Sequence, residues 1–372
     1  MIHDRCNWLC GCVSEDEPVI PFILWATFAA HVGPMGPDAP ARQPQLAANT
    51  STVVLTFGAG KAVYCSVSHD RGKTFSAPAK VAEAGILPLN RHRGPRVALS
   101  GNTIVITAVT GNQLDESPHA HGLPSDGDLS VWRSKDGGET WSKGKPINDA
   151  PGAATEGLHA LAANGQGTLF AAWLDKRGAR GTRLYAARST DDGATWSKNM
   201  AVYQSPDGSI CECCHPSVAI DAAGRLLVMW RNSLGGSRDM YLAASRDGVA
   251  FPAPEKLGNG TWQLNACPMD GGGLAVSPGK ILTAWRRGGD IFLAEPGHPE
   301  RQVGTGKDVA LALSGDRAYA LWSNGSRLEA WNGGKVEVLS AAGAFPSLCS
   351  LPSGGALAAW EENGAIEIRL LP

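Results

Sequence analysis

One short motif returns four times along the chain and limits what the chain can fold into. It reads Ser-Thr-Asp-Asp-Gly-Ala-Thr-Trp at 189–196, with close copies at 68–75 and 134–141 and a shortened copy at 245–251. Its Ser and Asp side chains are suited to bond backbone amides across a tight turn. Its Gly tolerates a positive φ, and its Thr and aromatic residue favour a following strand. The motif therefore predicts where hairpins turn, and its acidic residue is expected to be structural rather than catalytic.

The segments between these motifs repeat as well, from residue 42 onward. Each unit begins with a strand of the Pro-x-Leu/Val-Ala type, and its second strand ends in an aromatic residue. Seven units can be counted, and the last three are shorter and lack the turn motif. Four-stranded units of this size stack radially, because none can bury both faces alone. We therefore predict an all-β propeller over 42–372 with seven blades, or six as the alternative, in which an N-terminal segment supplies a missing outer strand.

The first 41 residues do not match the repeat. The apolar run at 21–30 is too short to span a bilayer. It resembles the hydrophobic region of a secretory signal, although acidic residues precede it at 15–17. Residues 1–41 are therefore expected to be a signal-like or linker segment of an exported protein, either periplasmic or secreted. The formal net charge is −2, without a basic block, which argues against a nucleic-acid partner.

In a propeller the loops sort by face, and the face opposite the turn motifs collects the unusual residues. We call this face, formed by the loops between second and third strands and between blades, the mouth. A function is expected there, since loops on a rigid scaffold carry sites. Glu156 with Asp175 or Asp239 is a candidate catalytic carboxylate pair at this face. The candidate ligand-binding residues are the arginines, whose planar donor forks match a carboxylate: Arg42, Arg96, Arg231, Arg238 and Arg286.

With these features the chain resembles the sialidase (neuraminidase) superfamily, in which the turn motif is known as the Asp box or BNR repeat. The resemblance covers roughly residues 42–372. It implies three arginines that clamp the carboxylate of an acidic glycan. Arg42 lies in an Arg-x-Pro-x-Leu motif that matches the first of them, and Arg231 and Arg286, which each follow a second-strand tryptophan, are candidates for the other two.

Two parts of that family's chemistry are missing here. The resemblance implies an acid/base Asp in the first blade's mouth loop, but 58–61 reads Gly-Ala-Gly-Lys. It also implies a Tyr nucleophile where this chain has Phe345, and a phenyl ring cannot form a covalent glycosyl intermediate. The expected function is thus a propeller that acts on or binds acidic glycans. An exo-sialidase-like glycoside hydrolase, a non-catalytic glycan- or protein-binding propeller, and a metal or thiol site remain the alternatives.

The most distinctive stretch is Ile-Cys-Glu-Cys-Cys-His-Pro at 210–216, which resembles a mouth loop of a bacterial subgroup of sialidase-like propellers. Disulfides, for instance from Cys211 or Cys213 to Cys267, are the favoured interpretation for an exported protein. A copper or zinc site is the second interpretation. The third is a c-type haem at Cys211-x-x-Cys214-His215, for which a crowded mouth leaves little room. The candidate metal ligands are His119, His121, His159, Cys211, Cys213, Cys214, His215 and Cys267. No other cofactor is expected.

Overall fold

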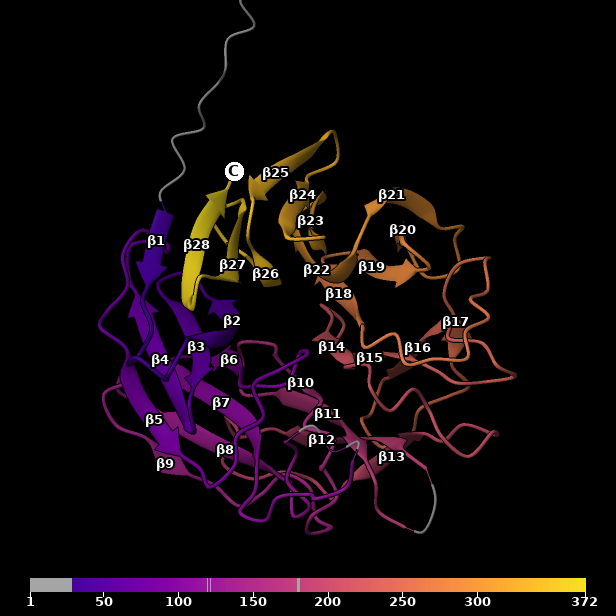
Figure 1. Cartoon of the computed structure of the whole chain (residues 1–372), viewed down its shortest axis with the longest axis horizontal. Helices are drawn as coiled ribbons and strands as arrows, with labels where there is room; N and C mark the ends of the chain where they lie inside the picture. The colour runs from indigo at the N-terminus through magenta and orange to yellow at the C-terminus, as the bar shows by residue number, and fades with distance from the viewer. Residues whose placement is uncertain (1–28, 119, 121, 179–180) are drawn as a thin grey trace, which may run out of the picture.

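The computed structural model describes residues 29–118, 120, 122–178 and 181–372. Over these residues it contains 28 strands and no helix, and so no helix that could cross a membrane. The strands form seven four-stranded antiparallel sheets, which are arranged radially as the blades of a propeller (Figure 1). The predicted count of seven blades is confirmed, and the six-bladed alternative is wrong. The signal-like run lies largely outside the described residues, as do His119 and His121.

The first four blades follow one another along the chain, and each is given from its innermost to its outermost strand. Blade 1 contains β2 (Arg42–Ala48), β3 (Val53–Ala59), β4 (Ala62–Ser68) and β5 (Ala79–Glu83). Blade 2 contains β6 (Arg96–Ser100), β7 (Thr103–Thr110), β8 (Asp128–Ser134) and β9 (Ser142–Lys143). Blade 3 contains β10 (His159–Ala163), β11 (Leu169–Asp175), β12 (Arg183–Ser189) and β13 (Met200–Tyr203). Blade 4 contains β14 (Ser217–Ile220), β15 (Leu226–Arg231), β16 (Met240–Ser245) and β17 (Glu255–Lys256).

The last three blades have shorter connections and lack the turn motif. Blade 5 contains β18 (Gly272–Ser277), β19 (Lys280–Arg287), β20 (Asp290–Ala294) and β21 (Arg301–Thr305). Blade 6 contains β22 (Lys307–Ser314), β23 (Arg317–Asn324), β24 (Arg327–Trp331) and β25 (Val336–Ser340). Blade 7 contains β26 (Ala344–Ser350), β27 (Ala356–Glu362), β28 (Ala365–Leu371) and β1 (Ala29–Val32).

Blade 7 is completed by a strand from the other end of the chain. β1 pairs antiparallel with β28, from Ala29 opposite Arg369 to Val32 opposite Ile366 (Figure 1). The N-terminal segment therefore supplies the outer strand that the last repeat lacks, as the sequence predicted. This pairing removes an open edge from β28 and joins the two ends of the chain within one sheet.

The hydrophobic core lies between neighbouring blades, where second-strand aromatic residues insert. Trp173, Trp230 and Trp322 are fully buried, and Trp285 and Trp360 are 2% exposed. One continuous apolar cluster joins blades 3 and 4, and another joins blades 5 and 6. The second strand of each unit is therefore buried on both faces, which explains why its sequence is nearly uniformly apolar.

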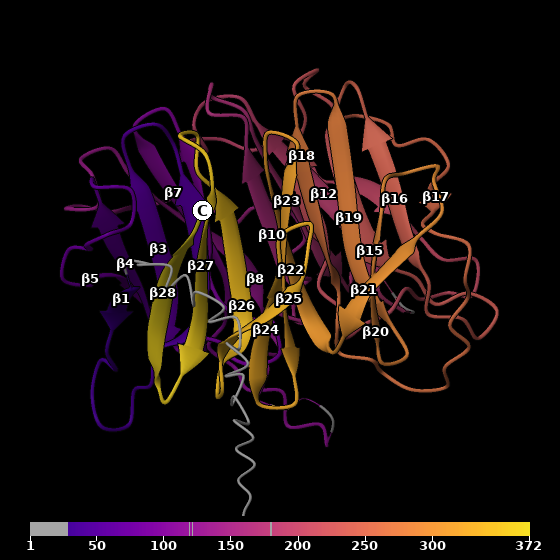
Figure 2. The same ribbon diagram turned by 90° about the horizontal axis from the view of Figure 1, so that it is seen from above.

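The turn motif performs the structural role that its residues predict. In the copy at 189–196, the Ser189 hydroxyl donates to Asp191 Oδ1 at 2.8 Å and accepts from the Gly193 amide at 3.0 Å. The Asp191 carboxylate accepts from the Thr195 amide at 2.9 Å and from its hydroxyl at 2.6 Å. These turns join third and fourth strands, so they gather at one end of the blades while the mouth loops gather at the other (Figure 2). The motif positions hairpins and leaves the mouth free for function.

The inner strands of blades 1, 6 and 7 each begin with a β-bulge at the mouth. The pairing register shifts after Arg42, Lys307 and Ala344. A bulge re-aims the side chains around it, and a non-glycine residue at positive φ costs about 1–3 kcal/mol. Of the nine described non-glycine residues with positive φ, seven lie in the bulges or mouth loops: Gln43, Arg91, His92, Met269, Asp308, Phe345 and Asn363. Backbone strain is therefore concentrated at this face.

Candidate functional site

The floor of the mouth is a polar cluster above the central channel. His92, from the loop between β5 and β6, lies 2.8 Å from Asp308 Oδ1 on β22, measured from Nε2. The His215 ring is 4.4 Å away from the His92 ring, centroid to centroid, and the edge of Phe345 contacts the other side at 5.4 Å. A cavity of about 230 Å³ begins at this cluster and continues between the inner strands. His92, His215 and Asp308 thus all line this cavity.

Two carboxyl groups of this floor titrate in opposite directions. Asp270 is buried, and burial together with the neighbouring Asp308 charge raises its pKa. Burial also opposes the ionisation of Asp308, but the hydrogen bond and charge of His92 outweigh it and lower the pKa of Asp308. Asp270 Oδ2 accepts from the Asp308 amide at 3.2 Å, while Asp270 Oδ1 is buried without a hydrogen-bond partner. Carboxyl groups whose pKa values are pushed apart are typical of acid–base chemistry.

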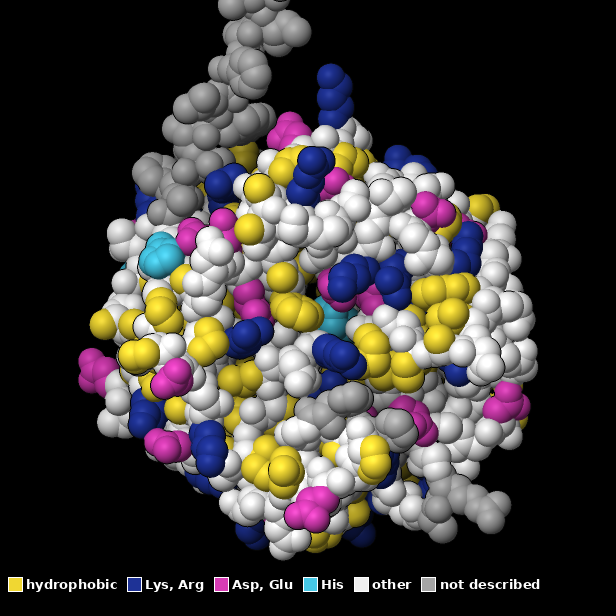
Figure 3. All heavy atoms as spheres, viewed as in Figure 1, with side chains coloured by type: hydrophobic (Ala, Val, Ile, Leu, Met, Phe, Trp, Pro, Cys, Tyr) yellow, Lys and Arg dark blue, Asp and Glu magenta, His cyan; other side chains and the backbone are white. Residues whose placement is uncertain are grey.

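The outer part of the mouth presents cations above buried carboxylates. In three ion pairs the basic side chain is 44–56% exposed and its acidic partner only 8–11% exposed. The pairs are Arg42–Glu361 at 3.6 Å, Lys176–Glu156 at 2.6 Å and Lys307–Asp308 at 3.7 Å. Figure 3 shows this face, with Lys and Arg side chains around a central hollow in which a His side chain is visible. The solvent-exposed member of each of these three pairs is therefore the cation, although the pairs themselves are neutral.

Two of the five predicted ligand-binding arginines are buried and bind backbone carbonyls instead. Arg231 donates to the carbonyls of Asp270, Arg238 and Arg286 at 2.9, 2.7 and 3.0 Å. Arg96 donates to the carbonyls of Pro95 and His92. Both guanidinium groups hold mouth loops together, and their donors are used for that purpose.

The other three predicted arginines reach the mouth surface to different extents. Arg286 pairs with Asp270 at 3.1 Å and lies over the Trp262 ring. Arg238 donates to the Ser233 hydroxyl at 2.6 Å. Arg42 is the most exposed of these three arginines, and 46% of its side-chain surface is accessible. The sequence motif around Arg42 therefore points to a group that a ligand can contact.

Each predicted catalytic carboxylate has a cationic partner of its own. Asp175 is fully buried and accepts from Arg177 and from the Trp173 indole. Asp239 accepts from the Trp262 amide at 2.8 Å and pairs with Lys256 at 3.3 Å. Glu156 is 8% exposed beneath Lys176. The pairing of Glu156 with Asp175 or Asp239 remains a prediction, whereas the His92, Asp270 and Asp308 cluster was not predicted as a site.

The cysteine loop brings three sulfur atoms together. The Sγ atoms of Cys211 and Cys214 are 3.1 Å apart, those of Cys211 and Cys213 are 3.7 Å apart, and those of Cys213 and Cys214 are 4.0 Å apart. The six described cysteines are free thiols, so the favoured disulfide to Cys267 is not formed in this structure. A hydrogen bond from Cys213 lowers the pKa of Cys267 to about 7.

The two described candidate histidines lie apart from the sulfur cluster. His159 is buried on β10 and its Nε2 lies 3.0 Å from the Thr107 hydroxyl. His215 packs against His92 at the floor. The group of potential ligand atoms that lie within 4.8 Å of one another contains the three thiols without either histidine. A mixed thiolate–imidazole site is therefore not assembled among the described residues.

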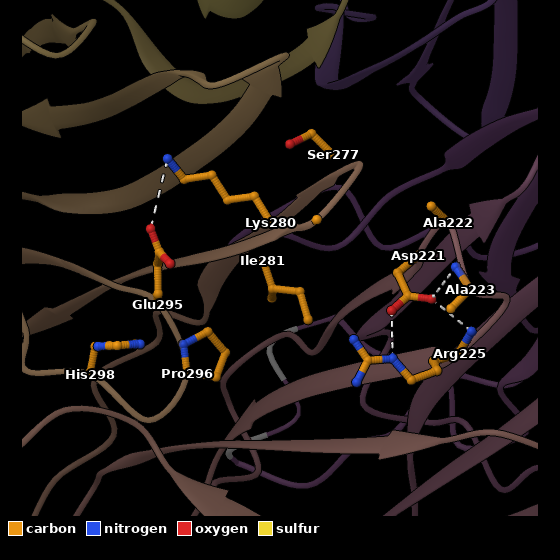
Figure 4. A pocket seen from close by; sticks show the side chains of 11 residues that line it. Asp221, Ala222, Ala223, Arg225, Ser277, Lys280, Ile281, Glu295, Pro296 and His298 are labelled. Carbon is orange, nitrogen blue, oxygen red and sulfur yellow. Dashed lines mark hydrogen bonds and ion pairs between the residues drawn. The ribbon is translucent and has the colours of Figure 1, made fainter.

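A groove of about 350 Å³ lies on the opposite face, between blades 4 and 5. Its charged side chains already pair within the groove, Asp221 with Arg225 at 2.6 Å and Lys280 with Glu295 at 3.7 Å (Figure 4). None of the described residues that line it is a non-glycine residue with a positive φ, in contrast to the mouth. The mouth is therefore the better candidate for function, and the groove provides matched control residues.

Comparisons with known proteins agree with this fold. Residues 125–276 match the BNR repeat-like domain family. A protein of unknown function from Dyadobacter fermentans is 16% identical, with 93% of this chain and 100% of that chain covered and a TM-score of 0.52. An ulvan lyase, a polysaccharide lyase, is 12% identical, with 92% and 96% covered and a TM-score of 0.52. The Hadza microbial sialidase Hz136 is 16% identical, with 76% and 63% covered and a TM-score of 0.48.

The family match lies within the propeller, over the outer two strands of blade 2, blades 3 and 4, and the first strand of blade 5. The predicted resemblance to BNR-repeat propellers is confirmed by this match over 125–276, and the fold is shared with the solved structures. At these sequence identities the structural likeness concerns the fold alone. No curated protein matches the sequence.

Proposed function

We propose that the protein binds an acidic glycan at the mouth. The observation that carries this proposal is the set of three exposed cations, Arg42, Lys176 and Lys307, held above carboxylates that are themselves buried. Such pairs present positive charge to a ligand while each cation remains fixed by its partner. An anionic group of a bound sugar would gain charge-assisted hydrogen bonds at this rim.

The fold supports a glycan as the class of ligand. A structure of the ulvan lyase was determined with a glucuronate-containing, sulfated saccharide, and it shares this fold at a TM-score of 0.51 and 12% identity. The aromatic surfaces of Trp262 and Phe345 lie beside the charged groups of the mouth, where sugar rings could stack. We also propose that the protein meets this ligand after export, consistent with the signal-like run at 21–30.

The mouth cations can be tested by neutralisation. We expect the variant R42Q/K176Q/K307Q to bind an acidic oligosaccharide at least about 50-fold more weakly than the wild type, because each charge-assisted contact contributes about 1 kcal/mol or more. Isothermal titration calorimetry with sialylated, uronate and sulfated oligosaccharides would measure this.

The matched control for this test is R225Q/K280Q, which removes two cations from the groove on the opposite face. This control should bind like the wild type. Equal affinity of the mouth variant and the wild type, at equal thermal stability, would contradict the proposal, and so would the failure of every acidic oligosaccharide to bind.

Cleavage of the bound glycan is a second candidate function, favoured by the opposed pKa shifts of Asp270 and Asp308 beside His92. In this hypothesis His92, oriented by Asp308, would exchange a proton with the glycan, and Phe345 would leave no covalent intermediate of the Tyr type. Product analysis after incubation separates the two functions. Fragments formed by the wild type and absent with His92→Gln would identify an enzyme, whereas intact glycan would identify a binding protein.

A further inference from the structure

The three sulfur atoms of the cysteine loop have the spacing of ligands around one metal ion. Their separations of 3.1, 3.7 and 4.0 Å are well above the S–S bond of about 2.05 Å in a disulfide. A metal–sulfur distance of about 2.3 Å places neighbouring thiolates about 3.8 Å apart in a tetrahedron and about 4.0 Å apart in a trigonal plane. Small side-chain rotations would bring Cys211, Cys213 and Cys214 to these values. The loop therefore holds three sulfur donors around a common centre, rather than a pair of sulfur atoms with a third one apart from it.

The three sulfur atoms are shielded from solvent, and a further sulfur-containing side chain packs against their residues. The three cysteines are 3%, 7% and 1% exposed, and Met269 packs against them. Met269 adopts a φ of 57°, a strained conformation, and its sulfur lies 3.9 Å from Arg91 Nη1. Cys267, two residues earlier, hydrogen-bonds to Cys213. Thiolate and thioether donors select Cu(I) and Zn(II) over hard cations.

Positive charge is available to compensate the thiolates that a metal would create. Arg231 interacts electrostatically with Cys211 and Cys214, and Arg93 does so with Cys213. Both guanidinium groups are buried and fixed, Arg231 by three backbone carbonyls and Arg93 by the Glu156 carbonyl at 2.6 Å. A buried group of deprotonated thiols would otherwise be strongly unfavourable.

We propose that Cys211, Cys213 and Cys214 bind one thiophilic d10 metal ion. Three thiolates satisfy Cu(I) by themselves, whereas Zn(II) requires a fourth donor, for which Cys267 lies beside Cys213. Binding replaces the thiol protons by the metal and involves no change in oxidation state, so the protons leave to solvent. This site is independent of the proposed glycan function.

The test uses the full chain, purified under reducing conditions, and loads it separately with Cu(I) and Zn(II) in the presence of a competing chelator. We expect about one equivalent of metal per chain by elemental analysis, with three thiols protected from alkylation until a stronger chelator is added. Cys213→Ser, at the most exposed of the three positions, should reduce the retained metal by at least tenfold. Cys349→Ser, a thiol outside the cluster, should retain the wild-type amount.

Cys267→Ala distinguishes the two ions and changes an exposed residue, so the fold should be preserved. It should weaken Zn(II) binding at least tenfold and leave one equivalent of Cu(I) bound. Three results would overturn the proposal: less than about 0.2 equivalents of both metals in the wild type, full metal retention by a folded Cys213→Ser variant, or a disulfide among these cysteines in the native protein under conditions that reduce accessible disulfides.

Discussion

Replacing Arg231 by methionine is expected to lower the free energy of unfolding by about 3–5 kcal/mol. The guanidinium group is buried, and it donates to three backbone carbonyls: that of Arg238 in the loop between β15 and β16, that of Asp270 in the loop before β18, and that of Arg286 in β19. Removing it leaves these acceptors unsatisfied and takes a compensating charge away from buried Asp270. Equilibrium denaturation in urea would measure the loss.

The matched control for Arg231 is Arg225→Met, on the opposite face. Arg225 pairs with Asp221 at 2.6 Å but its side chain is 39% exposed, so its loss should cost about 1 kcal/mol or less. If Arg231→Met were as stable as the wild type yet lost affinity for an acidic glycan, Arg231 would be a ligand clamp rather than a structural bridge. That result would restore the role that the sequence resemblance implied.

Acidification below pH 6.5 is expected to destabilise the protein through its buried histidines. Burial lowers the pKa of His159 to about 3, compared with about 6.5 for an exposed histidine. Between these two pH values His159 is protonated in the unfolded chain but neutral in the folded protein. The free energy of unfolding therefore decreases as the pH falls from 6.5 toward 3. The slope for this residue is about 1.4 kcal/mol per pH unit. Burial lowers the pKa of His215 as well, which adds to the effect.

The contribution of His159 can be isolated with His159→Gln, which keeps a polar group near the Thr107 hydroxyl. Between pH 6.5 and pH 4.5 the wild type should lose about 2–3 kcal/mol more stability than this variant, measured by denaturation at each pH. Equal pH dependence of the two proteins would show that His159 is protonated in the folded state. Because the difference is taken between the two proteins, the carboxyl groups that they share do not contribute.

The fold was predictable because its signals are local and repeated. Each turn motif forms bonds within a few residues, as between Ser189, Asp191 and Thr195, so no distant partner is needed to specify it. The need for an extra outer strand in blade 7 followed from counting strands, and β1 supplies it. Radial stacking then fixed the side of the propeller on which the mouth lies.

The site was less predictable because the burial of a side chain and the pairing register of a strand depend on residues that are distant in the sequence. Arg231 and Arg286 both follow a second-strand Trp, yet Arg231 is buried against carbonyls. In the sequence, Asp308 is indistinguishable from the first residue of an ordinary strand. Only the pairing of β22 with β23 in the structure shows the bulge that brings Asp308 close to His92. The thiols converge because the loop is anchored, with the Cys211 amide bonded to the Arg231 carbonyl at 3.2 Å. Spacing along the sequence alone fits a disulfide equally well.

In the proposed function, the mouth recognises the negative charge of a glycan. Its most direct test is calorimetric titration of the wild-type protein with an acidic oligosaccharide and with the same oligosaccharide after its carboxyl groups have been reduced to alcohols. We predict that the acidic form binds at least about 100-fold more tightly than the reduced form, and that added salt weakens it. Equal affinity for the two forms would contradict recognition of charge by Arg42, Lys176 and Lys307.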